Sequence, residues 1–155
     1  MTVARYFVRA ATAADQDLLV DFTLREARDA EGVTLDPAGV RRGVAQAFVD
    51  PALARYWVAE GPDGRIVAST SVTAEWSNFH GGHYWWVQSL FVVPEHRGAG
   101  LVDQLLDHLA QAARDDGALD LRLYAHEDNA RALRAYARCG FTVAPYRMMR
   151  RRLDG

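Results

Sequence analysis

Four stretches of the chain are predicted to be helical, the first and the third because apolar residues recur in them at helical spacing. Asp36-Pro37 marks the start of the second stretch, because aspartate caps a helix N-terminus and proline fits the first turn. Gly140 marks the end of the fourth, since glycine commonly follows the last turn of a helix. The pattern therefore predicts helices over Ala14–Arg28, Asp36–Val49, Leu101–Arg114 and Asn129–Cys139.

Runs of β-prone residues fill most of the remaining chain. The longest run, Tyr84–Val93, ends at Pro94. The turn residues Gly61–Gly64 separate two shorter runs and predict a hairpin, and Glu75–His83 is predicted to be a polar loop. Strands are predicted over Val3–Arg9, Arg55–Glu60, Arg65–Ala74, Tyr84–Val93, Leu119–Ala125, Phe141–Val143 and Tyr146–Arg151, the last two as a final pair.

The order of these elements predicts the fold class. A strand, a crossing helix and a second strand in the middle of the chain imply at least one parallel pair, while the other connections favour antiparallel neighbours. We predict an α+β fold with a mixed, mostly antiparallel central sheet and helices on both faces. The chain has 155 residues and no low-complexity linker, which predicts a single domain over residues 1–155.

Composition excludes several classes of function. A formal net charge of −2 argues against a nucleic-acid-binding protein. No apolar run approaches the roughly 20 residues that a membrane span needs, and the first residues do not resemble a signal peptide. The single cysteine, Cys139, permits no internal disulfide and no multi-cysteine zinc site. We therefore expect a cytoplasmic protein without a membrane partner, and the sequence implies no metal.

The turn after Pro94 carries the first candidate site, in the segment Arg97-Gly98-Ala99-Gly100-Leu101-Val102. A helix start offers unpaired amides and a partial positive charge, and glycines let that backbone approach an anion closely. Arg97 adds a cation suited to phosphate. These features predict a pyrophosphate site. The segment is neither a Walker loop nor a complete dinucleotide fingerprint, and taken alone it is equally compatible with an ordinary strand–helix turn.

A second motif lies downstream of this loop. It has the pattern N-x-x-A-x-x-x-Y-x-R-x-G-F, formed by Asn129, Ala132, Tyr136, Arg138, Gly140 and Phe141. Combined with Val92-Val93-Pro94-x-x-Arg97-Gly98-x-Gly100, it resembles the GCN5-related N-acetyltransferase (GNAT) superfamily. The resemblance is firm from Trp86 to Phe141, and the element order extends it over the whole chain.

The resemblance implies that acetyl-CoA lies where two parallel strands splay apart in the middle of the sheet. It implies that the backbone of Leu90, Phe91, Val92 and Val93 binds the thioester carbonyl and the pantetheine arm, and that the amides of residues 97–102 bind the pyrophosphate. It also implies that Asn129 contacts pantetheine and that Tyr136 protonates the leaving thiolate. Val102 departs from the family pattern, which usually has glycine or alanine there, and this leaves open a longer acyl group or an acyl-carrier donor.

The resemblance does not assign the general base, because the comparable positions carry Gln88, Ser89 and Tyr124. Glu75 is the carboxylate nearest the predicted gap and is our candidate, with His80 and His83 as alternatives. The candidate substrate-binding residues are Trp76, Trp85 and Gln88. Trp85 and Trp86 point to opposite faces of their strand, so one is expected in the core. The other either forms part of the acceptor pocket wall or is a second packing residue on the opposite face.

The predicted function is transfer of an acetyl group from acetyl-CoA to a primary amine of a small molecule, by direct attack in a ternary complex. Acetylation of a protein or peptide amine, and a non-catalytic CoA-binding module, stay open as alternatives. Glu26, Asp29 and Glu31 are suited to attract a cationic acceptor, although they are also ordinary solvated residues. The aromatic strand is compatible with a homodimer.

Overall fold

The structure is a computed structural model that describes residues 5–154. It divides into two compact units, residues 5–124 and residues 125–154, and each is described by itself. The predicted first strand begins at Val3 and Ala4, which lie outside the described residues, and β1 covers Phe7–Ala10. The single domain predicted for the whole chain stays a prediction.

The larger unit is built on a five-stranded sheet in the order β1-β2-β3-β4-β5. After β1, its strands are β2 (Arg55–Glu60), β3 (Ile66–Ser77), β4 (Gly82–Val92) and β5 (Leu121–Leu123). Neighbouring strands from β1 to β4 are antiparallel, and β4 and β5 are parallel. The mixed, mostly antiparallel sheet is thereby confirmed. The parallel pair follows from the helix that connects β4 to β5, as a crossover connection requires.

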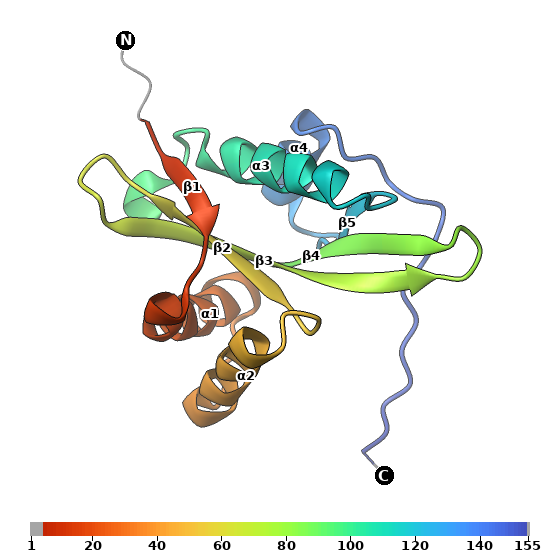
Figure 1. Cartoon of the computed structure of the whole chain (residues 1–155), viewed down its shortest axis with the longest axis horizontal. Coiled ribbons are helices and arrows are strands. Elements are labelled where there is room, and N and C mark those ends of the chain that lie inside the picture. The colour runs from red at the N-terminus through yellow and green to blue at the C-terminus, as the bar shows by residue number, and fades with distance from the viewer. Residues whose placement is uncertain (1–4, 155) are drawn as a thin grey trace. The chain divides into compact units, whose positions relative to one another are not determined.

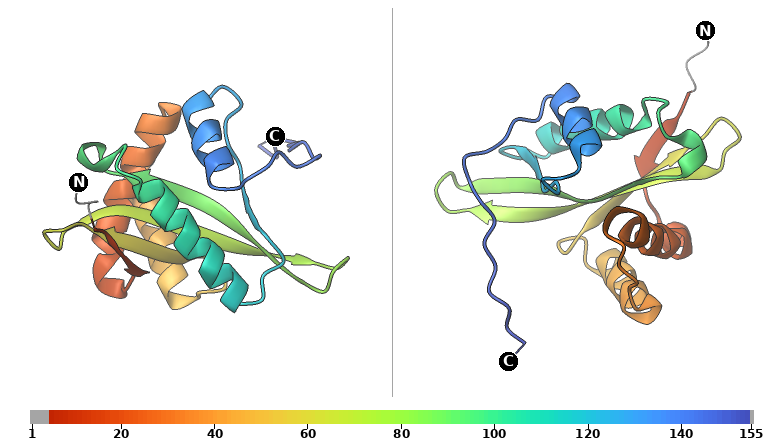
Figure 2. Two further views of the ribbon diagram at one scale, coloured as in Figure 1. Left: turned by 90° about the horizontal axis from the view of Figure 1, so that it is seen from above. Right: turned by 180° about the vertical axis from the view of Figure 1, so that it is seen from behind.

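Helices cover both faces of this sheet, as predicted (Figure 1 and Figure 2). Helices α1 (Gln16–Glu31) and α2 (Pro37–Val49) pack on one face, and α3 (Leu101–Asp115) packs on the other. Asp36 caps α2 by accepting hydrogen bonds from the amides of Ala38 and Gly39, both at 3.1 Å. The cap fixes where α2 begins and so positions the helix beside α1.

A β-bulge in β4 shapes the centre of the sheet. Ser71 pairs with Ser89 and Val72 pairs with Val87, so Gln88 has no opposite residue on β3. An extra residue reverses the alternation of the following side chains. Trp86 and Ser89 therefore face the same side of the sheet, the side covered by α1 and α2.

Strands β4 and β5 pair over a short length, from Trp85↔Leu121 to Val87↔Leu123. Beyond Val87, β4 continues to Val92 with no strand on that side within the described residues. The predicted splayed parallel pair is present, and the backbone of β4 is open on one edge just where the bulge begins.

The polar loop predicted over Glu75–His83 is wrong. Strand β3 runs on to Ser77 and β4 begins at Gly82, so Glu75 lies in a strand opposite Tyr84. Gly81, with φ of +63°, closes the tight turn. The prediction failed because polar residues on one strand pair with aromatic residues on the next, and this stabilisation depends on the partner rather than on local composition.

The smaller unit contains α4 (Ala130–Arg138), preceded by the cap residue Asn129 and followed by Gly140 with φ of +91°. The final strand pair predicted over Phe141–Val143 and Tyr146–Arg151 is wrong, since residues 141–154 form no strand. An isolated two-stranded hairpin is marginal in water without a core to cover. Here Val143 is 95% exposed and Met149 is 91% exposed, so their alternation buries nothing.

Candidate donor loop and acceptor pocket

The segment of residues 97–102 joins β4 to α3 through a tight backbone path. Gly98 and Gly100 have φ of +79° and +80°, in the left-handed region where glycine avoids the steric cost of a side chain. Within the described part of the chain, the backbone amides of residues 98–102 have no hydrogen-bond partner. These amides stand at the N-terminus of a 15-residue helix, which is a favourable place for an anion.

The core anchors the start of α3. Leu101 and Leu105 are buried in a cluster with Ala68 and Val92 of the sheet, and Val102 packs against the same cluster. The side chain of Val102 therefore packs on the sheet side of the helix. Its backbone amide is still available to an anion, so this departure from the family pattern does not block the loop.

Arg97 is engaged by the protein itself. Its Nε donates to the carbonyl of Val92 at 2.9 Å, and its Nη2 donates to Asp29 on α1 at 3.3 Å. The guanidinium also lies over the ring of Phe91, 5.7 Å from the centroid. Arg97 thus connects the loop to α1, and its predicted role at the pyrophosphate rests mainly on its position beside the open amides.

The predicted donor-binding strand segment has mixed surroundings. Phe91 faces α1, where its ring lies 4.9 Å from that of Phe22, while Leu90 and Val93 pack on the α3 side. The amide of Val93 donates to the carbonyl of Val67 at 2.9 Å. The amide of Leu90 instead donates to Oε1 of Glu26 on α1, at 3.0 Å. The bulge thus directs one amide of β4 toward α1 rather than toward a neighbouring strand.

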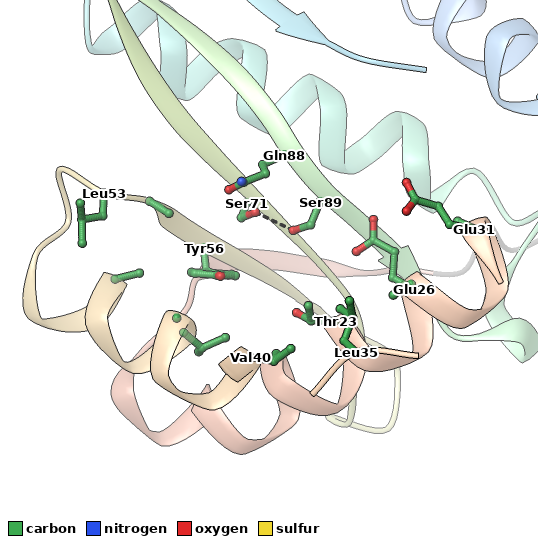
Figure 3. A pocket seen from close by; sticks show the side chains of 16 residues that line it. Thr23, Glu26, Glu31, Leu35, Val40, Leu53, Tyr56, Ser71, Gln88 and Ser89 are labelled. Atoms are coloured by element: carbon green, nitrogen blue, oxygen red, sulfur yellow. Dashed lines mark hydrogen bonds between the residues drawn. The ribbon is translucent and has the colours of Figure 1, made fainter. Parts of the chain in front are cut away.

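A pocket of about 490 Å³ lies between α1, α2 and the face of the sheet that these two helices cover (Figure 3). Its apolar wall includes Leu35, Val40, Val44, Ala47 and Leu53. Its polar lining includes Thr23, Glu26, Glu31, Tyr56, Ser71, Gln88 and Ser89. The described residues that line it include two carboxylates and no arginine or histidine, and the chain contains no lysine.

Glu26 is the most perturbed acid of this pocket. Burial raises the pKa of Glu26 from 4.5 to about 7, the hydrogen bond from Leu90 lowers it, and the charge of Glu31 raises it. The pKa of Tyr56 is raised as well, by burial and by the charge of Glu26. Figure 3 shows Glu26 directed from α1 toward β4, near the hydrogen-bonded pair Ser71 and Ser89.

Glu75 lies outside the pocket lining. It is exposed on β3 and accepts a hydrogen bond from Nε1 of Trp86 at 3.3 Å. It lies four positions after Ser71 along the strand, a distance of roughly 13 Å. Trp86 stacks on Tyr124 with ring centroids 4.5 Å apart. The structure therefore places Glu75 in an aromatic cluster farther along the hairpin, and its role as base stays a prediction.

The predicted substrate residues have different environments. Gln88 lines the pocket. Trp85 is 1% exposed and packs against Trp57 and Arg55, on the opposite face of the sheet. Trp76 is 60% exposed. His80 and His83 are exposed at the hairpin end, where His83 contacts Trp76. The structure brings only Gln88 of this set into the pocket.

The smaller unit holds the other two candidates. Asn129 accepts a hydrogen bond from the amide of Ala132 at 3.1 Å and so caps α4. Tyr136 is half-buried on α4, with its ring 6.0 Å from that of Phe141. Their predicted contacts with the donor stay predictions.

Sequence reasoning did not recognise Glu26 as a site residue of its own. A signal was available, because Leu19, Phe22 and Glu26 stand at positions i, i+3 and i+7 of one helix. That spacing places the carboxylate on the face that packs against the sheet. A charged residue at a buried position of an amphipathic helix is a candidate functional group.

No helix among the described residues is long and apolar enough to cross a membrane. No group of three or more histidine, cysteine, aspartate or glutamate side chains in the same range is placed to hold a metal ion.

Two curated proteins similar in sequence to this chain are acetyltransferases. Over 88 residues the chain is 35% identical to streptothricin acetyltransferase of Streptomyces lavendulae, covering 56% of this chain and 44% of that protein. Over another 88-residue match it is 31% identical to L-methionine sulfoximine/L-methionine sulfone acetyltransferase of Salmonella typhimurium, covering 57% and 52%. The chain thus spans about half the length of these curated relatives.

Among solved structures, a possible acetyltransferase from Clostridium difficile 630 has a TM-score of 0.90 and 26% identity, over 97% of this chain and 99% of that one. A predicted acetyltransferase from Clostridium acetobutylicum, solved with acetyl-CoA, shares the fold with a TM-score of 0.76 at 20% identity, over 95% and 96%. The model of the acetyltransferase (GNAT) family matches residues 18–141, most of the chain, and the protein belongs to that family.

Proposed function

We propose that this protein transfers an acetyl group from acetyl-CoA to the primary amine of a small molecule. The observation that carries the proposal is the position of β4 at residues 88–90. After Val87 one edge of the strand no longer has β5 as a neighbour. On the face that α1 and α2 cover, Gln88 and Ser89 line the acidic pocket. A donor arm along the open edge and an acceptor in the pocket would meet at this point, so binding would supply much of the rate by orientation.

The donor is bound mainly by backbone. In this proposal the open amides of residues 98–102 hold the pyrophosphate, and the segment from Leu90 to Val93 holds the pantetheine arm and the thioester carbonyl. Asn129 contacts pantetheine and Tyr136 protonates the leaving thiolate. The GNAT family uses acetyl-CoA, and Val102 leaves space for phosphate because its side chain packs on the core.

The acceptor is proposed to be a cationic amine that carries no carboxylate. Glu26 and Glu31 attract a positive charge, and the aliphatic wall accommodates an apolar body. A carboxylate on the acceptor would find no cationic partner among the described lining residues, and burial of an unpaired charge is costly. The relative from Streptomyces lavendulae, whose name gives streptothricin as its substrate, supports a small-molecule acceptor.

The reaction balances without a covalent enzyme intermediate. The ammonium loses a proton, the neutral nitrogen attacks the thioester carbon, and the C–N bond forms as the C–S bond breaks. The nitrogen then loses its second proton and the thiolate gains one, so an ammonium and acetyl-CoA give an amide, CoA and one proton. The oxyanion that develops on the thioester oxygen is stabilised by a β4 amide.

The test is thiol release from acetyl-CoA with a panel of amines, combined with calorimetric titration of the donor. We expect micromolar to millimolar donor binding and amine-dependent release. Donor binding without turnover on any amine or peptide would favour a non-catalytic CoA-binding module. Because the chain contains no lysine, self-acetylation on lysine cannot contribute to the signal.

A peptide acceptor is the second candidate, and the same assay separates it. An amino-terminal peptide panel that exceeds every small amine in kcat/KM would replace the small-molecule proposal. A lower rate of acetylation in Tyr136→Phe than in the wild type would support Tyr136 as the acid, since this variant keeps the ring and removes the hydroxyl proton.

We also propose that the protein forms a homodimer. The apolar side chains exposed in the C-terminal segment support this proposal, among them Val143, Tyr146 and Met149. Light scattering across a concentration series tests it, with a dimer mass expected and a monomer mass at all concentrations as the contrary result.

A further inference from the structure

Glu26 is a carboxylate at the junction between the pocket and β4. It belongs to α1, it lines the pocket, and its Oε1 accepts the hydrogen bond of the Leu90 amide at 3.0 Å. Leu90 is the second residue after the bulge, in the part of β4 that has no β5 partner. One carboxylate therefore contacts both the acceptor pocket and the strand edge assigned to the donor.

We propose that Glu26 receives the acceptor ammonium and takes its proton, and that the thioester carbonyl of the donor displaces Glu26 from the Leu90 amide. The inference rests on the proposed function, because it requires a thioester at Leu90. It adds a residue for a role that the GNAT motif left unassigned in this chain.

The geometry provides a reason for displacement. A backbone amide has one proton to donate, and the Glu26 carboxylate already accepts it. A thioester carbonyl that binds the same amide must replace the carboxylate. The released carboxylate stays within side-chain reach of the thioester carbon, because both oxygens compete for one N–H group. An amine held by Glu26 is then next to its electrophile.

The proton transfer is consistent with the surroundings of Glu26. The groups that face it are Glu31 on α1, Tyr56 on β2, Ser71 on β3, and Gln88 and Ser89 on β4. The α2 residues that line the pocket carry no titratable side chain. With no cation facing it among the described lining residues, the pKa of Glu26 is about 7, so the carboxylate that accepts the proton is present at and above neutral pH. A base whose pKa is near the working pH is efficient. The proton it takes then returns to water after the amide forms.

Displacement also predicts proton uptake. The hydrogen bond from Leu90 lowers the pKa of Glu26, so its loss raises that pKa. Binding of acetyl-CoA near pH 7 is therefore coupled to uptake of a proton. CoA lacks the acetyl carbonyl, so the hydrogen bond between the Leu90 amide and Glu26 is kept when it binds. Binding of CoA is therefore coupled to less proton uptake than binding of acetyl-CoA.

The first experiment is calorimetric titration of acetyl-CoA and of CoA, at pH 7, in buffers with different heats of ionisation. We expect net proton uptake with acetyl-CoA, a smaller value with CoA, and no difference between the two ligands in Glu26→Gln. Equal uptake by both ligands in the wild type would overturn the displacement. Failure of both ligands to bind would instead refute the proposed function.

The second experiment is the pH dependence of kcat/KM for an active amine. We expect the wild type to rise with pH through a limb near neutrality. Glu26→Gln should lose that limb and about 10²–10³-fold of the rate, as removal of a general base does. Glu26→Asp, which keeps the carboxylate on a shorter side chain, should restore part of the limb and part of the rate.

Two further variants complete the comparison. Asp17→Asn makes the same charge change on α1 at a side chain that is 88% exposed, and it should keep the wild-type limb. Glu75→Gln tests the other candidate base. Loss of the limb in Glu75→Gln with its retention in Glu26→Gln would overturn the proposal and assign the base to Glu75. The proposal is also overturned if Glu26→Gln keeps both the rise of kcat/KM near neutral pH and the wild-type rate.

Discussion

The proposed donor loop and the proposed acceptor pocket are built in different ways. The donor loop consists of consecutive residues, and its candidate binding groups are backbone amides at the start of α3. The pocket takes side chains from α1, α2, β2, β3 and β4, so residues far apart in sequence form it. A backbone site depends on the local path of the chain and leaves side chains free to vary. A side-chain site depends on the whole fold, and its chemistry changes with single substitutions.

The pocket also makes the stability of the protein depend on pH. Glu26 keeps a carboxyl in a place that disfavours its charged form. Its folded pKa of about 7 exceeds the ordinary value, so the folded state binds more protons between pH 4.5 and 7 and loses stability as pH rises through that range. Glu26→Gln should therefore be more stable than the wild type at pH 8, by about 1–3 kcal/mol.

Chemical denaturation of both proteins at pH 5 and pH 8 measures this difference. The advantage of Glu26→Gln should be small at pH 5 and should grow toward pH 8. An advantage independent of pH would show that packing, rather than charge, separates the two proteins.

Gly100→Ala examines the donor loop. Alanine in the left-handed region costs about 1–2 kcal/mol, and relief of that strain moves the amides away from a shared centre. We expect donor affinity to fall by about 10-fold, which corresponds to 1.4 kcal/mol. Titration of CoA measures it.

Gly64→Ala is the matched control for this variant. Both glycines have φ of +80° and open space where a Cβ would be added. Gly64→Ala should lose similar folding stability in the β2–β3 turn and keep wild-type donor affinity. An equal loss of affinity in the two variants would mean that the strain acts through global stability.

Glu31→Gln sharpens the description of the pocket. Glu31 raises the pKa of Glu26, so its removal should shift the limb of the kcat/KM profile to lower pH. The KM of a cationic amine should rise about 3-fold, the effect expected for one exposed charge. A shift of the limb to higher pH would contradict the assigned electrostatics.

Val102→Ala should have the smallest effect on the donor loop. The side chain packs against the core cluster, so its truncation should cost about 1 kcal/mol of folding stability. Donor affinity should change less than about 2-fold, because the backbone amide is retained. A large gain in affinity would show that valine crowds the phosphate site after all.

The sequence predicted most of the fold and the glycine turn before α3 because their signals are local. The cap at Asp36, the glycines at 98 and 100 and the leucines of α3 each act within a few residues. The paired region of Glu75 and Tyr84 was missed, because that pairing depends on a partner strand.

The acceptor side was harder to predict for the same reason. The contact between Glu26 and Leu90 joins residues 64 positions apart. Helical spacing placed Glu26 on an inner face, but it did not show which strand lay opposite. The prediction of a C-terminal strand pair was the opposite error, because it placed strands where there are none. The alternation of residues there is compatible with a sheet, but residues 141–154 do not form one.

A comparison of thiol release with an amine and with its carboxylated counterpart, such as tyramine with tyrosine or agmatine with arginine, tests the acidic pocket. The acidic pocket predicts that kcat/KM for thiol release is at least about 10-fold higher for the amine without the carboxylate. Equal or better turnover of the amino acid would contradict the account of the pocket, and no thiol release from acetyl-CoA with any amine would contradict the acetyl transfer itself.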